Sequence, residues 1–357
     1  MKLIFDINGG DNKAEIIKGA IDASNEFNKE IILVGREDFI KENLQGLDYD
    51  KDKVEIVDAS ENIENNEEPV LALRKKKDSS IVKAMTLLKE KKAQALISAG
   101  STGALLGGGI FIVGRIKGIK RGVLPTLIPG LKSNTLVIDS GANMDTSPEL
   151  LGEFAILGDV FLREYYKIEN PKIGLLNVGV EEGKGNALYK EAYQRLKESD
   201  VNFVGNVEAR EIMDNDVDLL VCDGFDGNVL LKSIEGVVEF ATKNVFHSIA
   251  TSDLDDRSKK AFTDFLMKKF KNLDAKEVGG TILLGIDGNI IKAHGNSDAR
   301  AIKNAAKYAI DIVESNIVDK IKDKVEKWWR IEFYKLLLNN STLMKMILQK
   351  IWTFKMT

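Results

Sequence analysis

The sequence predicts an α/β protein of three layers, α/β/α, in which helices cover both faces of a mostly parallel sheet. Short runs rich in Ile, Val and Leu alternate with longer amphipathic helical patterns, as strands and helices do in βα units. No Pro-, Ser- or Gly-rich linker and no internal repeat divides the 357 residues. We therefore expect a single α/β domain over residues 1–317, although the length would also allow two domains.

The first expected elements are a strand at residues 2–7 and a helix at about 12–28. Seven further strands are expected at residues 30–35, 53–59, 93–100, 134–143, 171–179, 201–207 and 217–225. Nearly every strand ends in Gly, Asn, Ser or Asp. Because the ligand crevice of a doubly wound sheet lies beyond the carboxyl ends of its strands, these polar endings predict one shared site.

Residues 95–114 carry no charge over a length that could cross a bilayer. Three hydroxyl residues and six glycines interrupt the segment, and glycine weakens a helix interior. A strand, a glycine turn and a helix packed closely on a sheet explain the same residues. We therefore expect this soluble arrangement rather than a spanning helix.

Residues 233–272 carry two amphipathic helical patterns with Asp, Ser and Arg between them. This pattern predicts a helical hairpin that projects from the sheet. Its apolar stripes would be buried in the core, in a dimer or against lipid.

Composition excludes several function classes. The net charge of −4 and the pI near 5.6 argue against a nucleic-acid binder, which needs a basic face. One cysteine, Cys222, and two histidines, His247 and His294, exclude a disulfide framework and argue against a zinc site. We expect Cys222 and His247 to be structural. The N-terminus lacks the long apolar centre of a signal peptide, which suits the cytoplasm.

Five glycine-containing turns follow predicted strands. They occupy residues 8–12 (NGGDN), 98–104 (SAGSTGA), 139–145 (DSGANMD), 177–186 (NVGVEEGKGN) and 222–228 (CDGFDGN). Such turns let backbone N–H groups approach an anion without obstruction by a Cβ. None spells the dinucleotide fingerprint, and Gly183-Lys184 is followed by Gly185 where a P-loop needs Ser or Thr. We expect a simpler anion than a nucleotide, and neither a metal nor a cofactor.

His294 follows an apolar strand and precedes Ser297 and Asp298, either of which would cap the next helix. A strand-to-helix turn is a common place for a functional residue in α/β folds. Functional and structural roles remain open for His294 on this pattern.

Taken in their order along the chain, the glycine turns, the His294 turn and the sequence around them resemble the PlsX family, the acyl-ACP:phosphate acyltransferases of bacterial phospholipid synthesis. The similarity runs from residue 1 to about 317. The blocks that carry it are Gly9-Gly10-Asp11, EEPVLALRKKKDSS (67–80), SAGSTGA, DSGANMDTSPELLGEFAILG (139–158), LLNVGVEEGKGN (175–186), CDGFDGNVLLKSIEG (222–236), GGTILLG (279–285) and HGNSDARA (294–301). Ser101 stands where the family usually has Asn, which puts substrate preference in question.

The resemblance implies a fold similar to phosphate acetyltransferase and the isocitrate-dehydrogenase-like enzymes, in a homodimer that associates peripherally with the membrane. It implies transfer of a long-chain acyl group from acyl carrier protein (acyl-ACP) to inorganic phosphate. The acyl phosphate would pass to a membrane acyl-phosphate:glycerol-3-phosphate acyltransferase. A transacylase that uses short acyl-CoA and a scaffold that binds acyl-ACP without turnover are the alternatives.

This reaction needs positioning and electrostatics more than a strong base. Phosphate is mainly a dianion at neutral pH and a thiolate leaves readily. The predicted catalytic residues are Lys184, His294, Asn143 and Asn228. The predicted phosphate- and substrate-binding residues are Gly9, Gly10, Asp11, Ser101, Thr102, Gly103, Asp139, Gly179, Glu182, Gly185, Asn186, Asp223 and Gly227.

We expect Lys184 to hold the phosphate, and the amides of Asn143, Asn186 and Asn228 to donate to phosphate or oxyanion. Glu181 and Glu182 are expected to orient Lys184 or to cap the following helix. The basic run LRKKK (73–77) is either a docking patch for an acidic carrier protein or a solvated helix face.

The C-terminal extension, residues 318–357, is basic and amphipathic. Nine Lys and Arg against four acids give +5, in a chain of net charge −4. Apolar residues including Ile321 and Val325 fall near one helical face. The pattern predicts a segment that lies in a membrane interface, with a helix packed back on the protein as the alternative.

Overall fold

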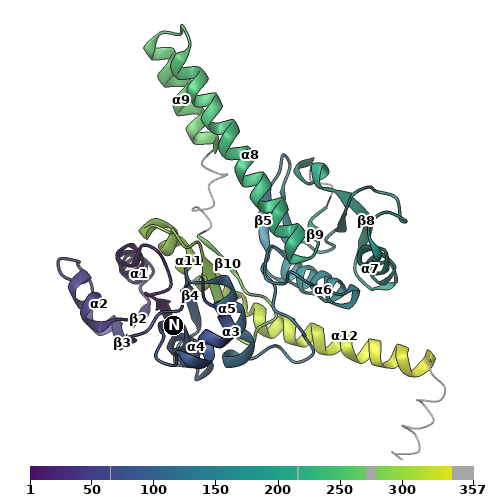
Figure 1. Ribbon diagram of the computed structural model, residues 1–357, viewed down its shortest axis with the longest axis horizontal. Coiled ribbons are helices and arrows are strands. Elements are labelled where there is room, and N and C mark those ends of the chain that lie inside the picture. The colour runs from purple at the N-terminus through teal and green to yellow at the C-terminus, as the bar shows by residue number, and fades with distance from the viewer. Residues whose placement is uncertain (65, 215–216, 271–278, 340–357) are drawn as a thin grey trace, which may run out of the picture.

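Two mostly parallel sheets form the centre of the computed structural model, which describes residues 1–64, 66–214, 217–270 and 279–339 (Figure 1). The first sheet has the order β10-β11-β4-β1-β2-β3, with only β10 antiparallel to its neighbour. Its strands are β1 (Lys2–Asp6), β2 (Glu30–Gly35), β3 (Val54–Asp58), β4 (Ala95–Ser98), β10 (Gly280–Ile282) and β11 (Asn289–Ala293).

The second sheet has the order β5-β6-β9-β7-β8, and again one edge strand, β5, is antiparallel. Its strands are β5 (Thr126–Pro129), β6 (Asn134–Ile138), β7 (Ile173–Asn177), β8 (Phe203–Glu208) and β9 (Leu219–Val221). Each predicted strand therefore exists, and the α/β class is confirmed. The prediction of one sheet did not anticipate that the strands divide between two.

Helices cover both sheets, as the fully apolar central strands require. The helices of the first sheet are α1 (Lys13–Phe27), α2 (Glu37–Asn43), α3 (Pro69–Lys75), α4 (Ser80–Lys89), α5 (Thr102–Gly108) and α11 (Ala299–Ser315). The second sheet carries α6 (Pro148–Glu164), α7 (Ala187–Glu198) and α8 (Gly224–Thr251), and α9 (Asp256–Phe270) follows α8. The last helix, α12, spans Ile317–Asn339.

One cluster of buried apolar side chains includes residues of both sheets, among them Phe5 of β1, Leu136 of β6 and Phe154 of α6. The sheets thus share a core, and their carboxyl edges are held in fixed relation. Residues 95–114 form β4, α5 and a π-helical turn, Gly109–Val113, as the interpretation of a strand, a turn and a helix predicted. No described helix combines the length and apolarity needed to cross a membrane.

The predicted hairpin is confirmed as α8 and α9, which project together from the body in Figure 1. Helix α8 begins at Gly224, earlier than the predicted 233, because Asp223 caps it by accepting from the Asp226 N–H at 2.7 Å. The outer parts of both helices expose large apolar side chains: Val237, Phe240, Phe262 and Phe265 are 52–69% exposed.

The first turns of the C-terminal extension pack on the protein. Ile321 and Val325 of α12 are buried, and Lys320 forms an ion pair with Glu164 of α6 at 3.0 Å. A membrane-facing role is therefore wrong for these two apolar residues, because their helical face is covered by α6. Residues 340–357 lie outside the described part of the chain.

Candidate active site

Three loops converge at the carboxyl edge of the first sheet, after β1, β4 and β11. The Asp11 N–H donates to the Gly295 carbonyl at 2.9 Å, which joins the first loop to the third. A Cβ on Gly9 would lie 2.2 Å from Asp6 Oδ2, and one on Gly10 would lie 3.0 Å from the Ala99 Cβ. Glycine is therefore required here by close approach, as the sequence predicted for an anion-binding turn.

Asp6 is a site residue that sequence reasoning missed. It ends β1 with its side chain buried, and it accepts hydrogen bonds from Ser80 Oγ at 2.5 Å and from Ser98 Oγ at 2.7 Å. Burial raises the pKa of this carboxyl, although the two serines oppose the shift. An acid that closes a mainly apolar strand, two residues before Asn8 and the glycine pair, was the available signal.

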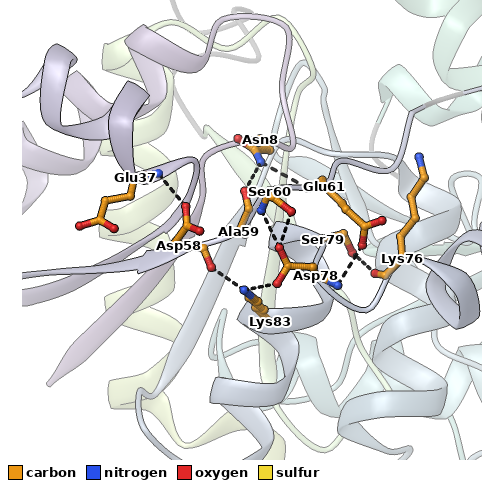
Figure 2. Close-up of polar contacts among 10 residues, drawn as sticks. All are labelled: Asn8, Glu37, Asp58, Ala59, Ser60, Glu61, Lys76, Asp78, Ser79 and Lys83. Atoms are coloured by element: carbon orange, nitrogen blue, oxygen red, sulfur yellow. Dashed lines mark hydrogen bonds and ion pairs between the residues drawn. The ribbon is translucent and has the colours of Figure 1, made fainter.

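A network of polar contacts links the loop after β3 to the start of α4 (Figure 2), and beside it the Ser80 N–H donates to the Glu61 carbonyl at 3.3 Å. The Asp78 carboxylate accepts from the Ser60 N–H at 2.9 Å and from Lys83, and hydrogen bonding to Lys83 holds its pKa well below the usual range. Asn8 Nδ2 donates to the Ala59 carbonyl at 3.3 Å. The loop after β3 is thereby fixed against both the first glycine turn and α4.

His294 lies at the predicted strand-to-helix turn. Its carbonyl accepts from Ser297 Oγ at 2.7 Å, and Asp298 caps α11 as expected, by accepting from the Ala301 N–H at 2.9 Å. Burial lowers the pKa of the imidazole, and the nearby Lys292 lowers it further. The ring is therefore mainly neutral at pH 7, able to donate one hydrogen bond and to accept one.

The predicted residues Ser101, Thr102 and Gly103 begin α5 beside this group of loops, half-buried. A Cβ on Gly103 would lie 2.6 Å from the Pro69 side chain, so this glycine serves packing of α5 against α3.

Asp139 organises the loop after β6 at the edge of the second sheet. Its carboxylate is fully buried and accepts from the backbone N–H groups of Leu124, Gly141, Ala142 and Asn143. Asn143 Nδ2 donates to both the Gly122 carbonyl and Asp139 Oδ2, each at 2.8 Å. Both amide hydrogens of Asn143 are therefore engaged within the protein, which makes it an organiser of this loop in the present structure.

The start of α8 packs directly on the Asp139 loop. The Gly224 N–H donates to the Asn143 carbonyl at 2.8 Å, and a Cβ on Gly227 would lie 1.9 Å from the Asp139 carbonyl oxygen. The side chain of Asn228 lies beside Gly141. The structure thus brings five predicted residues together: Asp139, Asn143, Asp223, Gly227 and Asn228.

The Lys184 loop lies at the same edge, between β7 and α7. Asn177 Nδ2 donates to the Lys184 carbonyl at 3.2 Å, and Gly185 has a φ of +89° that suits glycine. The Lys184 ammonium is 3.9 Å from Glu181 and its side chain is half exposed. Gly179 and Asn186 belong to the same loop, and Asn186 caps α7.

Glu182 departs from expectation. Its carboxylate accepts from Gln194 at 2.8 Å and pairs with Lys197 at 3.1 Å, both on α7. The expectation that it orients Lys184 or caps the helix is wrong, because the side chain lies along α7 and Asn186 provides the cap. Glu181 is the residue that pairs with Lys184.

A cavity of about 650 Å³ lies between the Lys184 loop, α7 and α8. Apolar side chains provide one part of its lining, and polar or small residues provide the other: Leu176, Val178, Ala209, Val229 and Leu230 together with Asn177, Gly185, Asn186, Tyr189, Asp226 and Ser233. Tyr189 Oη donates to Asp226 Oδ2 at 2.5 Å and accepts from the Asp223 N–H at 3.3 Å. This tyrosine connects the cavity to the Asp139 loop.

The edges of the two sheets also approach each other. Ala142 of the Asp139 loop packs against an apolar cluster that contains Ile4, Leu96 and Ile290 of the first sheet. Lys232 and Glu235 of α8 both affect the pKa of His294, in opposite directions. The predicted residues therefore form two groups at facing edges, linked by α8 and Ala142.

The structure also describes the surroundings of Cys222 and of the side chains that could bind a metal. Cys222 is fully buried, and burial raises the pKa of its thiol well above the usual value, so it is unreactive as a thiolate. Among the described residues, no three His, Cys, Asp or Glu side chains are grouped as metal ligands would be.

Comparison with known proteins identifies the family. A family profile described as "Fatty acid synthesis protein" matches residues 1–320. The chain is 45% identical over 332 residues to a phosphate acyltransferase of Clostridium tetani, covering 91% of this chain and 98% of that protein. It is also 45% identical over 330 residues to a phosphate acyltransferase of Clostridioides difficile, covering 92% and 97%.

Among solved structures, a phosphotransacetylase from Streptococcus pyogenes is similar with a TM-score of 0.53 and 17% identity, covering 91% of this chain and 94% of that chain. A branched-chain phosphotransacylase from Enterococcus faecalis gives a TM-score of 0.54 at 14% identity, covering 88% and 99%. These similarities concern the fold. The sequence relationship is closer, and it shows that the chain belongs to the PlsX family of fatty acid synthesis proteins, as a phosphate acyltransferase.

Proposed function

We propose that this phosphate acyltransferase transfers a long-chain acyl group from acyl-ACP to inorganic phosphate, forming acyl phosphate for phospholipid synthesis. The observation that carries the choice of substrate is the cavity of about 650 Å³ beside the Lys184 loop. Its apolar walls suit a hydrocarbon chain, and Asn177, Asn186 and Asp226 place polar groups at the same cavity.

In the proposed reaction a phosphate oxygen attacks the thioester carbonyl directly. The carbonyl carbon becomes tetrahedral and its oxygen becomes an oxyanion, which collapses with loss of the thiolate of acyl carrier protein. Donors at the two sheet edges hold the dianion and stabilise the oxyanion, so the catalysis is mainly electrostatic. No covalent acyl-enzyme is required, and the buried Cys222 is not suited to form one.

The decisive experiment follows phosphate-dependent thiol release and traps acyl phosphate with hydroxylamine. Palmitoyl-ACP and acetyl-CoA are compared as donors at equal concentration. We expect acyl hydroxamate from palmitoyl-ACP. A preference for acetyl-CoA would instead identify a short-chain transacylase, and binding of acyl-ACP without any acyl phosphate would identify a scaffold.

Acyl carrier protein is the proposed partner, and the basic run at the end of α3 is the proposed docking surface. Arg74, Lys75 and Lys77 are exposed, whereas Lys76 is engaged by Glu67 at 2.7 Å. Exposed cations attract an acidic carrier at long range and this attraction weakens with salt. Reversing Arg74 and Lys75 to Glu should raise the KM for acyl-ACP without changing the KM for phosphate.

We also propose that the protein is a homodimer that acts in the cytoplasm and contacts the membrane peripherally, passing acyl phosphate to a membrane acyl-phosphate:glycerol-3-phosphate acyltransferase. The exposed Phe240 and Phe265 of the hairpin are suited to bury against a second copy or against lipid. Sedimentation of a Phe240→Asp variant distinguishes these possibilities: loss of dimer mass supports the subunit contact, while unchanged mass with lost vesicle binding supports the lipid contact.

A further inference from the structure

Lys292 lies near the end of β11 and has no role in the sequence motifs or in the proposed mechanism. The strand register pairs Ser98 of β4 with Asp6 of β1 on one side and with Lys292 of β11 on the other. Residues in register on parallel neighbours project from the same face of a sheet. An acid, a hydroxyl and an ammonium therefore form a row across three adjacent strands at their carboxyl ends.

This row lies on the face of the first sheet that α4 covers, since Ser80 at the start of α4 donates to Asp6. Two residues earlier on the same strands, Ile4, Leu96 and Ile290 pack in one apolar cluster, and Ala142 of the Asp139 loop packs against that cluster. The glycine turns at residues 8–12 and 294–298 rise from the ends of the same strands. Lys292 is thus the cation at the base of the first sheet's glycine turns, close to Asp11 and His294.

The Lys292 ammonium has hydrogen-bonding capacity to spare. It donates to the Ala293 carbonyl, and an ammonium carries three donors. In the part of the chain that the structure describes, no carboxylate forms an ion pair with it. Asp6 is already satisfied by Ser80 and Ser98, so Lys292 is not needed as its hydrogen-bonding partner.

We propose that Lys292 binds the inorganic phosphate, holding the dianion at the carboxyl end of β11 beside the glycine turns, with Asp6 kept away from it by its hydrogen bonds to Ser80 and Ser98. This assignment rests on the proposed function and adds a second cation to the Lys184 of the opposite edge. Lys184 is half exposed and lies 3.9 Å from a carboxylate, whereas Lys292 is largely withdrawn from water. A desolvated cation with free donors interacts more strongly with an anion than an exposed one does.

The electrostatics of Lys292 give the proposal a pH signature. Burial lowers its pKa to about 8, while Asp11 and Asp6 act in the opposite direction. His294, on the same strand end, also faces the lysine. In the free enzyme the ammonium is charged below that pKa and neutral above it, so phosphate affinity should fall as pH rises through about 8.

The test measures phosphate binding by calorimetry with inorganic phosphate alone, together with acyl phosphate formation, for wild type, Lys292→Met, Lys292→Arg and Lys303→Met. Methionine has a similar length without the charge. Lys303 of α11 is a control, since it pairs with Glu26 of α1. We expect Lys292→Met to raise the phosphate KM about 10- to 100-fold and to abolish the decline above pH 8. Lys292→Arg should retain binding without that decline.

Unchanged phosphate affinity in folded Lys292→Met would overturn the proposal, as would loss of stability with an unchanged phosphate KM, which would identify a structural counter-charge. If Lys292→Met does not fold, Lys292→Arg decides the matter, since a persisting decline above pH 8 would assign the titration to another group. Wild type that binds phosphate but yields no acyl phosphate would refute the proposed function and leave the Lys292 inference standing.

Discussion

Lys184 and Lys292 show how surroundings determine what a charged residue can do. Lys184 lies on the glycine-rich loop whose Val178, Gly185 and Asn186 line the cavity. Its side chain is half exposed, with Glu181 at 3.9 Å. It can reach toward a substrate without large rearrangement, but water and Glu181 weaken its field. Lys292 is fixed in a strand and partly desolvated. The two cations are therefore expected to contribute differently to phosphate binding.

Replacing Lys184 with alanine is expected to abolish phosphate saturation in the accessible concentration range. Loss of one charge-assisted hydrogen bond to the dianion costs about 1.5–3 kcal/mol, and the exposure of Lys184 places the expected loss at the lower end of that range. Initial rates against phosphate concentration measure the effect, with Lys190→Ala on the adjacent helix as a matched control. Kinetics equal to wild type in a folded Lys184→Ala protein would remove this lysine from the site.

Replacing His294 with glutamine is expected to reduce turnover while the fold is retained. Glutamine can still donate a hydrogen bond but cannot titrate, so a further loss in His294→Ala would separate hydrogen bonding from proton transfer. Turnover is measured across pH with circular dichroism as the check on folding. A profile identical to wild type would return His294 to a structural role.

The same substitution has a consequence for stability. The pKa of His294 is lowered on folding, so below about pH 6.5 the unfolded chain binds a proton that the folded chain resists. Wild type should therefore lose stability as pH falls through this range, and His294→Gln should lose less. Urea unfolding at about pH 7 and pH 5.5 measures the difference, and equal losses would mean that folding does not lower the pKa of His294.

Among the structural elements, α8 extends from the site into the hairpin. Two glycines inside this helix differ in the space available for a Cβ. Gly227 has no room for a Cβ because the Asp139 carbonyl oxygen would lie 1.9 Å away. A Cβ on Gly236 would meet nothing within 4 Å. The first glycine is required by packing, while the second only weakens the helix.

We therefore expect Gly227→Ala to destabilise the protein and to displace the start of α8, with loss of activity. Gly236→Ala should raise the free energy of unfolding by about 0.5–1 kcal/mol, because alanine favours a helix. Denaturant unfolding and activity of the pair provide the measurement. Equal stability of the two variants would mean that α8 does not dock on the Asp139 loop as described.

Helix α12 begins with residues that pack on the protein, and the chain continues into the basic extension. Ile321 and Val325 are buried against the body, so cutting the chain at Ile317 would expose core as well as remove the basic extension. A chain that ends at Lys327 keeps those contacts. Ending the chain at Lys327 rather than at Ile317 therefore separates loss of the basic extension from exposure of the core.

At the scale of the whole molecule, we expect the full chain to bind anionic vesicles more strongly than a chain ending at Lys327. Each Lys or Arg near an anionic surface contributes about 1 kcal/mol, and high salt should reduce the difference. Flotation with vesicles at low and high salt measures it, with neutral vesicles as the control. Equal binding by both chains would exclude a tail anchor and leave the hairpin as the membrane contact.

The sequence determined the local structure of this protein and the residues available for chemistry. Strands such as Lys2–Asp6 and Glu30–Gly35 are apolar runs closed by Asp or Gly, and Asp298 caps its helix as its position predicts. These features depend on neighbours in the chain, because propensity and capping act over a few residues. For the same reason, the glycine turns and the hairpin could be located in advance.

Only the tertiary structure decided how these parts combine. The division of the strands into two sheets depends on pairings between residues far apart in sequence, which periodicity does not encode. Asp6, Ser98 and Lys292 form a row only because β1, β4 and β11 are neighbours. Packing likewise engaged both amide hydrogens of Asn143 and buried Ile321, since hydrogen-bond partners and burial are properties of the folded chain.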